Sequence, residues 1–294
     1  MIDTETSIDR LTIVGYDVGI FSNYLKNSEY INSTGFSRNY GFRHSYSGLR
    51  GEHIETGDKG KVRIDFNPNK ANMDQVEKMI SGMKYPHLTR LDIAIDYFGK
   101  DLSTIDWTSS GRRKRNYWVD HKGTLETLYI GAPSSDKRFR IYNKALERKE
   151  NSHGEWEKDW EMQLEKHPLA VNGHWRVEVQ KRFKERDNIL NPKEYFLPNL
   201  FDIRAISKYV DVSHIENPME RGFVLGAMIN PSLLDEIHRN SRTKYNKMIK
   251  EAKERGGKAL EIEPHEIYEK EKSRLAHQLN DLFAKAFMPL QLSN

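Results

Sequence analysis

The chain contains no cysteine among its 294 residues. Disulfide bonds, zinc sites built on thiolates and catalysis by a cysteine nucleophile are therefore excluded. No stretch approaches the roughly 18 consecutive apolar residues that a membrane-spanning helix needs, so we expect no membrane partner. The first residues also lack the basic and apolar segments of a secretory signal. Together these absences predict a cytoplasmic protein.

Apolar residues are scarce as well, at 37%, whereas charged residues reach 31% and the mean hydropathy is −0.80. This composition is typical of a protein with a well-solvated surface. The length still allows one large domain or two smaller ones with their own core. The net charge of +4 is mildly basic, which is consistent with a nucleic-acid partner but does not establish one.

The hydrophobic pattern changes near residue 211. Before it, short alternating segments are separated by turn residues, and one helix is expected over residues 73–83. After it, helical spacing dominates, with a helix start near residue 231 and a last amphipathic helix near 264–287. We predict an α+β fold: a central antiparallel-rich β-sheet with flanking helices and a helical C-terminal region. The predicted domains are residues 1–211 and 212–294, and the pattern leaves open whether the two are continuous.

Residues 90–97 form the most informative predicted strand. Because side chains alternate between the two faces of a strand, one face is apolar and the other carries Arg90, Asp92 and Asp96. The two carboxylates lie roughly 7 Å apart along the strand. Burying carboxylates without partners costs several kcal/mol, so such a face holds a metal ion, a catalytic group or an ion-pair network, unless it is simply solvated.

Two further segments alternate in the same way. Residues 137–144 place Arg140, Tyr142 and Lys144 on one face, and residues 174–180 place Arg176 and Glu178 on one face. If the three strands lie side by side, their polar faces combine three carboxylates, one tyrosine and several cations. Carboxylate oxygens suit Mg²⁺ or Mn²⁺, and a tyrosine hydroxyl beside such a metal can attack a phosphodiester.

The proposed site consists of catalytic and metal-binding side chains. The candidate catalytic residues are Tyr142, Lys144 and Arg140, and the candidate metal ligands are Asp92, Asp96 and Glu178. The two cations and a bound metal are expected to lower the pKa of the tyrosine from its usual value near 10. The alternative is structural: the three carboxylates would pair with Arg90 and Arg176, and the tyrosine and lysine would be ordinary surface residues.

Two basic tracts are candidates for DNA binding. The first tract is followed by Tyr117 and Trp118, so it combines charge for phosphates with aromatic rings for unpaired bases. The second, over residues 239–258, could lie against a duplex. Either tract could instead be a solvated surface. The residues concerned are Arg112, Arg113, Lys114 and Arg115 in the first tract, Arg242, Lys244, Lys247 and Lys250 in the second, and Arg176 on the polar strand face.

Taken in order, three segments resemble the plasmid rolling-circle replication initiators of Gram-positive bacteria, of the staphylococcal-plasmid type. The segments are Arg-Leu-Asp-Ile-Ala-Ile-Asp (90–96), the stretch 127–147 with Arg-Ile-Tyr-Asn-Lys (140–144), and Trp-Arg-Val-Glu (175–178). The resemblance runs from near residue 40 to about residue 250. It implies a bacterial enzyme that binds its double-strand origin as a homodimer and nicks one strand through a tyrosine, here Tyr142. That tyrosine becomes linked to the 5′ phosphate, a 3′ hydroxyl is freed as primer, and the strand is later rejoined.

The resemblance also implies a host helicase as partner and contact with both duplex and single-stranded DNA. Residues 1–211 would then be the nicking domain, and residues 212–294 would recognise DNA and form the dimer. Related initiators of other families bind their metal through a His-hydrophobic-His motif, which is absent here. Carboxylates would therefore bind the metal, with His44 or His174 as an added nitrogen ligand. Two alternatives stay open: a carboxylate-metal nuclease without a covalent intermediate, and a non-catalytic DNA-binding repressor.

Overall fold

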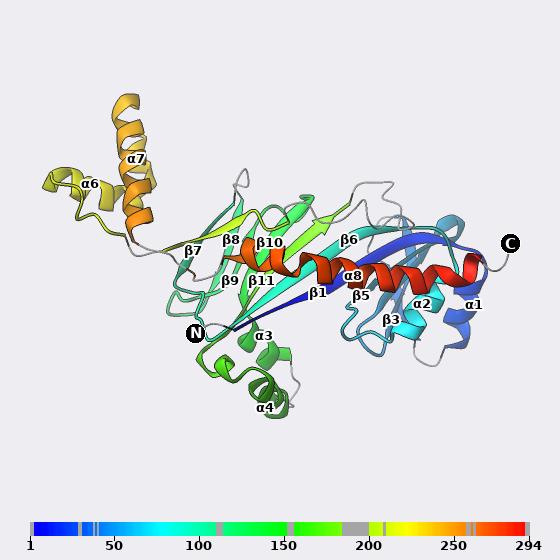
Figure 1. Ribbon diagram of the computed structural model, residues 1–294. Helices are drawn as coiled ribbons and strands as arrows, with labels where there is room; N and C mark the ends of the chain where they lie inside the picture. The colour runs from blue at the N-terminus through cyan, green and yellow to red at the C-terminus, as the bar shows by residue number, and fades with distance from the viewer. Residues whose placement is uncertain are drawn as a thin grey trace.

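The computed structural model describes residues 3–28, 31–37, 39, 41–109, 114–151, 156–183, 200–207, 210–256, 260 and 263–291. Its main feature is a sheet of ten strands in which every neighbouring pair is antiparallel (Figure 1). In spatial order the strands are β2 (Ile31–Phe36), β3 (Phe42–Gly48), β4 (His53–Gly57), β5 (Lys61–Phe66), β1 (Asp3–Asp17), β6 (Met83–Phe98), β11 (His174–Arg182), β10 (Lys137–Asn143), β9 (Leu125–Ile130) and β8 (Arg115–Val119). A separate pair consists of β7 (Ile105–Ser109) and β12 (Ile203–Ser207).

Helices lie around this sheet and beyond one end of it (Figure 1). The α-helices are α1 (Ile20–Asn27), α2 (Met73–Ser81), α3 (Lys144–Asn151), α4 (Trp156–Lys166), α6 (Pro218–Ile229), α7 (Arg239–Arg255) and α8 (Pro264–Gln291). Short 3₁₀ turns are η1 (Asp58–Gly60), η2 (Pro168–Asn172) and η3 (Pro231–Leu234). The predicted α+β fold, with its antiparallel sheet, flanking helices and helical C-terminal region, is confirmed.

One face of the sheet is apolar and is covered by helices. Ile93 and Ile95 of β6 are fully buried there, as the alternation of residues 90–97 predicts. Helix α8 crosses this face, and its Leu275, Leu279 and Phe283 join the same core (Figure 1). Burying such a side chain stabilises the fold by about 1.5–3 kcal/mol each. The apolar stripe of the last helix is therefore used inside the molecule.

The strands β9 and β10 form a hairpin. Gly131 follows β9 with a φ of 108°, a backbone conformation that residues with a Cβ rarely adopt. A Cβ at this position would also lie 3.0 Å from the carbonyl oxygen of Lys137. The glycine therefore fixes the turn, and the turn fixes the register in which Tyr142 lies opposite Thr127.

The strand β1 connects the two halves of the sheet, because β5 pairs with it on one side and β6 on the other. Its register with β6 shifts between Ile8 and Arg10, so Asp9 lies within a β-bulge. A bulge bends a strand and redirects a side chain. This irregularity matters for the site, because Asp9 reaches Arg176 two strands away.

The helices α6 and α7 lie away from the sheet (Figure 1). Helix α7 contains most of the second basic tract, residues 239–258. The helix expected to start near residue 231 is instead the 3₁₀ turn η3, in which the Asn230 side chain accepts a hydrogen bond from the Ser232 amide. That prediction was wrong because Pro231, a residue typical of helix starts, begins only a single 3₁₀ turn here.

Candidate active site

The second face of the sheet is polar and open, and it brings the three predicted strands together. Strands β6, β11 and β10 are direct neighbours. Tyr142 lies opposite Arg176, which lies opposite Asp96 on its other side. Two residues further along the strands, on the same face, Arg140 lies opposite Glu178. The side-by-side arrangement expected from the alternating patterns is confirmed.

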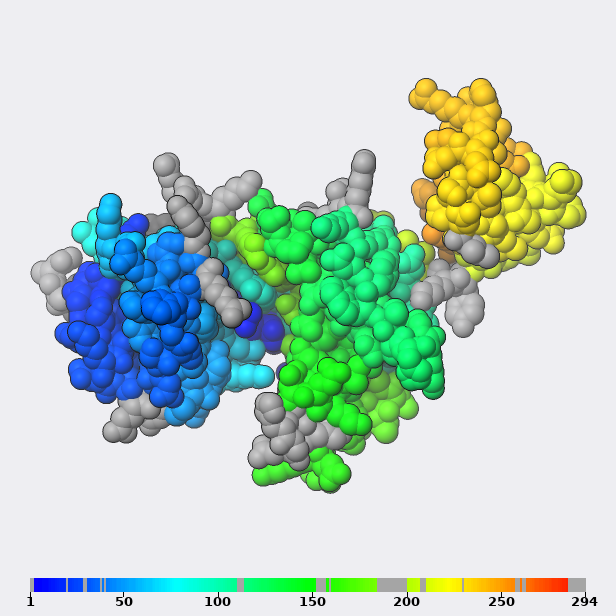
Figure 2. All heavy atoms as spheres, turned by 180° about the vertical axis from the view of Figure 1, so that it is seen from behind, coloured from blue at the N-terminus to red at the C-terminus, as the bar shows by residue number. Residues whose placement is uncertain are grey.

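Two adjoining cavities lie over this face. One, of about 560 Å³, is lined by Tyr142, Arg140, Glu178, Asp92 and other polar side chains. The other, of about 890 Å³, is lined by residues around Lys144 and Asp96. Asp9, Asn67, Lys70 and Glu147 line both, so the two form one groove. Figure 2 shows the hollow between the N-terminal half of the sheet in blue and the half in green.

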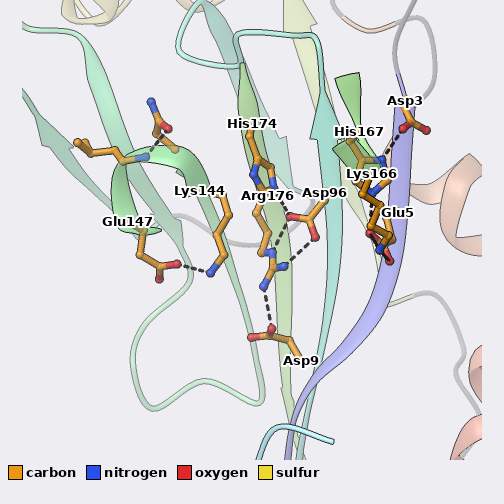
Figure 3. Close-up of polar contacts among 12 residues, drawn as sticks. Asp3, Glu5, Asp9, Asp96, Lys144, Glu147, Lys166, His167, His174 and Arg176 are labelled. Carbon is orange, nitrogen blue, oxygen red and sulfur yellow. Dashed lines mark hydrogen bonds and ion pairs between the residues drawn. The ribbon is translucent and has the colours of Figure 1, made fainter. Parts of the chain in front are cut away.

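One part of the groove holds a closed ion-pair network (Figure 3). Arg176 donates to both Asp96 oxygens, from Nε at 2.8 Å and from Nη2 at 2.7 Å, and its Nη1 lies 2.7 Å from Asp9. His174 adds a contact of 3.0 Å from Nε2 to Asp96. Burial alone would raise the pKa of Asp96, but the charge of Arg176 and the His174 contact hold this pKa far below its usual value.

This network changes what we infer for its members. Both oxygens of Asp96 are engaged, and Arg176 is only 7% exposed. We therefore no longer propose Asp96 as a metal ligand or Arg176 as a DNA contact. The structural alternative, pairing with arginine, describes Asp96 better. The burial of His174 lowers its pKa, and its Nδ1 has no hydrogen-bond partner among the described residues.

The other part of the groove holds Asp92 and Glu178, two buried carboxylates whose pKa values are raised. Asp92 accepts hydrogen bonds from Arg90 through both oxygens, with 2.8 Å from Nε to Oδ1, yet burial raises its pKa, and nearby Asp9 adds to the effect. Glu178 forms no ion pair or hydrogen bond with any residue that the structure describes. Burial, followed by the charges of Asp92 and Asp9, raises the pKa of Glu178 to about 8.

The donor set fits a divalent cation in part. Asp92 and Glu178 are diagonal neighbours on adjacent strands, roughly 7 Å apart. Within the described ranges, no three His, Asp or Glu side chains are close enough to enclose an ion by themselves. Mg²⁺ nevertheless needs only one or two carboxylates when water and substrate phosphates complete its coordination. The repulsion between these buried carboxylates is what a bound cation would relieve.

Tyr142 lies at the centre of the groove and is 2% exposed. The Arg140 guanidinium lies 3.7 Å from its ring centroid, and Lys144 Nζ lies 5.5 Å from it. We expected these cations to lower the pKa of the phenol, but burial raises that pKa strongly and Glu178 adds to the rise. Arg176 and Arg140 act to lower the pKa, but desolvation outweighs these neighbouring charges when no metal ion is bound. Without a further cation the hydroxyl therefore stays protonated.

The position of Lys144 differs from the prediction. The strand ends at Asn143, whose side chain accepts a hydrogen bond of 3.0 Å from the Leu146 amide, so Lys144 begins α3. Lys144 and Arg140 both bind Glu147, the latter at 3.2 Å. Because Lys144 is buried, its pKa is lowered despite this partner. Asn143 thus turns the chain so that Lys144 and Glu147 face the groove.

Two groove residues, Arg138 and Asp9, were not among the predicted site residues. Arg138 and Arg140 each have a buried Nε without a hydrogen-bond partner in the described part of the chain. Burial lowers the pKa of Arg138, and the charges of Arg182 and Arg140 act in the same direction. Arg138, Arg140 and Arg182 line the same cavity as Tyr142, and their positive charges suit an anion such as phosphate. The alternation of residues 137–144 places Arg138 on the same face as Tyr142, whereas nothing in the sequence pointed to Asp9.

The other predicted residues lie elsewhere. Arg112 and Arg113 fall outside the described residues. Lys114 is exposed and directly precedes β8, and Arg115, its first residue, lies 3.5 Å from Asp106. His44 is exposed on β3, four strands from β6. On α7, the four predicted basic residues each have an acidic neighbour: Arg242 with Asp235, Lys244 with Glu220, Lys247 with Glu251, and Lys250 with Glu254.

Comparisons with known proteins identify relatives of the chain. A replication initiation protein of Staphylococcus aureus is 32% identical over 202 residues, which are 67% of this chain and 57% of that protein. A second one from the same organism is 29% identical over 201 residues, with the same coverage. The chain is a relative of these replication initiation proteins. It spans 57% of the length of the replication initiation proteins that it matches.

The resemblance inferred from the strand motifs is thereby confirmed: the chain is related to replication initiation proteins. No protein-family model matches the chain. Among solved structures, the rolling-circle replication initiator protein of Geobacillus stearothermophilus aligns with 61% of this chain and 75% of its own, at 15% identity and a TM-score of 0.38. That score does not establish a common fold. None of the helices that the structure describes is both long and apolar enough to cross a membrane.

Proposed function

We propose that this protein initiates plasmid rolling-circle replication by nicking one strand of its origin. The observation that supports this most directly is the groove, where a tyrosine, two carboxylates with raised pKa values and several arginines line one cavity. The relationship to replication initiation proteins supplies the biological context. The geometry matches phosphodiester chemistry because it combines a nucleophile, anion-binding cations and ligands for a hard metal ion.

In the proposed reaction, Arg138 and Arg140 hold the phosphates of the strand beside Tyr142. Asp92 and Glu178 would hold Mg²⁺ or Mn²⁺, and such an ion would polarise the scissile phosphate and lower the pKa of the phenol. The Tyr142 hydroxyl gives up its proton as its oxygen forms a bond to phosphorus, the bond to the 3′ oxygen breaks, and the 3′ oxygen takes up a proton. The 5′-phosphotyrosine preserves the energy of the broken ester. Attack by a 3′ hydroxyl therefore rejoins the strand.

The remaining parts of the proposal concern partners. Helix α7 presents Lys244, Lys247 and Lys250 on a segment that lies away from the sheet, which suits contact with duplex origin DNA (Figure 1). We further propose that the protein acts as a homodimer in the bacterial cytoplasm and recruits a host helicase. These proposals rest on the family resemblance.

The test is an incubation of the protein with a labelled single-stranded origin oligonucleotide and Mn²⁺, followed by denaturing electrophoresis. Wild type is expected to give a covalent protein–DNA band, and Tyr142→Phe is expected to give none. Tyr129→Phe is the matched control, because Tyr129 lines the same cavity. An adduct that persists in Tyr142→Phe and disappears in Tyr129→Phe would move the nucleophile to the neighbouring tyrosine.

A second candidate is a hydrolytic nuclease, which the deep burial and raised pKa of Tyr142 favour. In that case cleavage occurs without an adduct and survives in Tyr142→Phe. The absence of any cleavage with Mg²⁺ or Mn²⁺ would instead favour a DNA-binding repressor.

A further inference from the structure

An exposed tryptophan lies in register with Tyr142 on the polar face. Trp118 of β8 is opposite Thr127 of β9, and Thr127 is opposite Tyr142 of β10. Side chains at directly opposite positions share one face of a sheet. Trp118 therefore lies on the face of the groove, two strands from the proposed nucleophile, or roughly 10 Å away.

The surroundings of Trp118 connect it to the anion site. Its ring contacts Tyr129 edge-on, with 5.1 Å between ring centroids and an angle of 73°. The Arg138 guanidinium lies 3.8 Å from the Tyr129 ring centroid, and both of these residues line the 560 Å³ cavity. Aromatic and cationic side chains thus continue from the edge of the sheet to Tyr142.

Trp118 remains 50% exposed although its ring is fixed by this contact. Strand β8 is the edge of the ten-stranded sheet (Figure 1), and no further strand of the described residues pairs with it on that side. A positioned aromatic surface beside a cationic cavity has the properties of a stacking platform for unpaired bases. The exposed ring and the adjoining arginines are independent observations that indicate the same class of ligand.

We propose that Trp118, supported by Tyr129, stacks an unpaired base of the strand whose phosphate lies at Tyr142. This inference rests on the proposed function for the identity of that strand. The bases of an intact duplex are already stacked on one another, so they cannot occupy this platform. The platform therefore selects unwound DNA for the reaction and disfavours intact duplex in the groove.

A neighbouring residue provides a matched control. Tyr117 was expected from the sequence to offer its ring to unpaired bases together with Trp118, and it is 53% exposed. It lies opposite Leu128, which is buried on the apolar side of the sheet, so Tyr117 does not share the face of the groove. A general loss of aromatic surface from β8 would affect both positions. A stacking site on the polar face depends on Trp118 alone.

The experiment measures the binding of oligothymidylate by fluorescence anisotropy to full-length wild type, Trp118→Phe, Trp118→Leu and Tyr117→Ala. Stacking energies predict that Trp118→Leu binds roughly 5- to 100-fold more weakly. Trp118→Phe should retain most of the affinity, because it keeps an aromatic face. Tyr117→Ala should bind like wild type. Leucine keeps an apolar side chain at this position, so weaker binding by Trp118→Leu would not result from a loss of folding. Thermal unfolding of each variant checks this.

Wild-type affinity in Trp118→Leu, or an equal loss in Tyr117→Ala, would overturn the stacking site. The adduct assay separates this inference from the proposed function. If wild type forms no adduct but Trp118→Leu still loses single-strand binding selectively, nicking fails and the stacking site stands. If the adduct forms and Trp118→Leu binds normally, nicking stands and the stacking site fails.

Discussion

Two aspartates on one strand, four residues apart, have opposite electrostatic surroundings. Asp96 lies opposite Arg176 and is also contacted by His174, so its charge is neutralised and its pKa is held low. Asp92 shares its surroundings with Glu178 and Asp9, and its pKa is raised although Arg90 pairs with it. The comparison separates a carboxylate that stabilises the sheet from carboxylates that the sheet holds at an energetic cost.

That cost is informative about function. Buried groups of like charge are destabilising unless a ligand of opposite charge binds to them. Perturbed carboxylates beside a tyrosine in a groove are therefore candidates for chemistry, whereas a neutralised one a few residues away is part of the scaffold. Four predictions test this contrast.

The largest stability effect is expected for Arg176→Met. It leaves buried Asp96 without its main partner, and removing one member of a buried pair costs about 3–5 kcal/mol. Chemical denaturation should show a loss of this size. The control is Lys166→Met, which removes an exposed pair with Glu5 and should change stability by less than about 1 kcal/mol. Equal effects would erase the distinction between the two kinds of carboxylate.

The second prediction concerns pH. The pKa of Glu178 is raised from 4.5 to about 8 on folding, so its contribution is fully present below pH 4.5 and is lost as the pH rises to 8. The loss is expected to be on the order of 4 kcal/mol by pH 8. His174 acts with the opposite sign, because its pKa is lowered. The measurement is therefore the difference between wild type and Glu178→Gln in denaturation at several pH values.

That difference should be small at pH 4.5 and should grow towards pH 8, with the variant the more stable protein. A pH-independent difference would show that Glu178 is ionised throughout and already has a partner. Asp96 does not disturb this window, because its lowered pKa confines its titration to more acidic conditions.

The third prediction uses a divalent ion in the absence of DNA. Mn²⁺ near saturation should stabilise wild type by about 1–3 kcal/mol at pH 8, since it binds the folded state and relieves the repulsion. The gain should shrink at pH 5, where protons compete for the carboxylates. Thermal unfolding of wild type and Glu178→Gln measures it. An equal gain in both proteins would mean that the ion binds elsewhere.

The smallest effect on stability is expected for Lys244→Gln on α7. Lys244 pairs with Glu220 at the surface, so thermal unfolding should be unchanged within error. If Lys244 contacts a duplex phosphate, binding should weaken uniformly across sequences, and the salt slope should fall by about one. An unchanged salt slope in a fluorescence titration would remove Lys244 from the DNA interface.

The sequence predicted the polar strand faces because their alternation is local. Period-two spacing was enough to place Asp92, Tyr142 and Glu178 on one surface, and the turn at Gly131 was recognisable from its residues. Pairing of the carboxylates with Arg90 and Arg176 was only an alternative at that level. Arg90 precedes Asp92 by two residues on the same strand, but only the register of β11 places Arg176 opposite Asp96.

The rest of the site depends on distant segments. Asp9 contributes through a bulge in a strand more than 160 residues before Arg176, and no local pattern signals that contact. The burial of Tyr142 was also missed, because burial is a property of the folded assembly. Local patterns therefore identify which side chains share a face, but not how far each is desolvated.

The position of α8 on the sheet has a consequence for folding while the chain is being synthesised. Its Arg274 donates a hydrogen bond of 2.6 Å to the carbonyl oxygen of Thr6 on β1, across a separation of 268 residues. A growing chain therefore exposes the apolar side of β1 and β6 until residues 264–291 have left the ribosome. Contacts this remote in sequence slow folding. Nascent chains with an uncovered sheet are also prone to aggregate, so premature termination before α8 would yield an insoluble product.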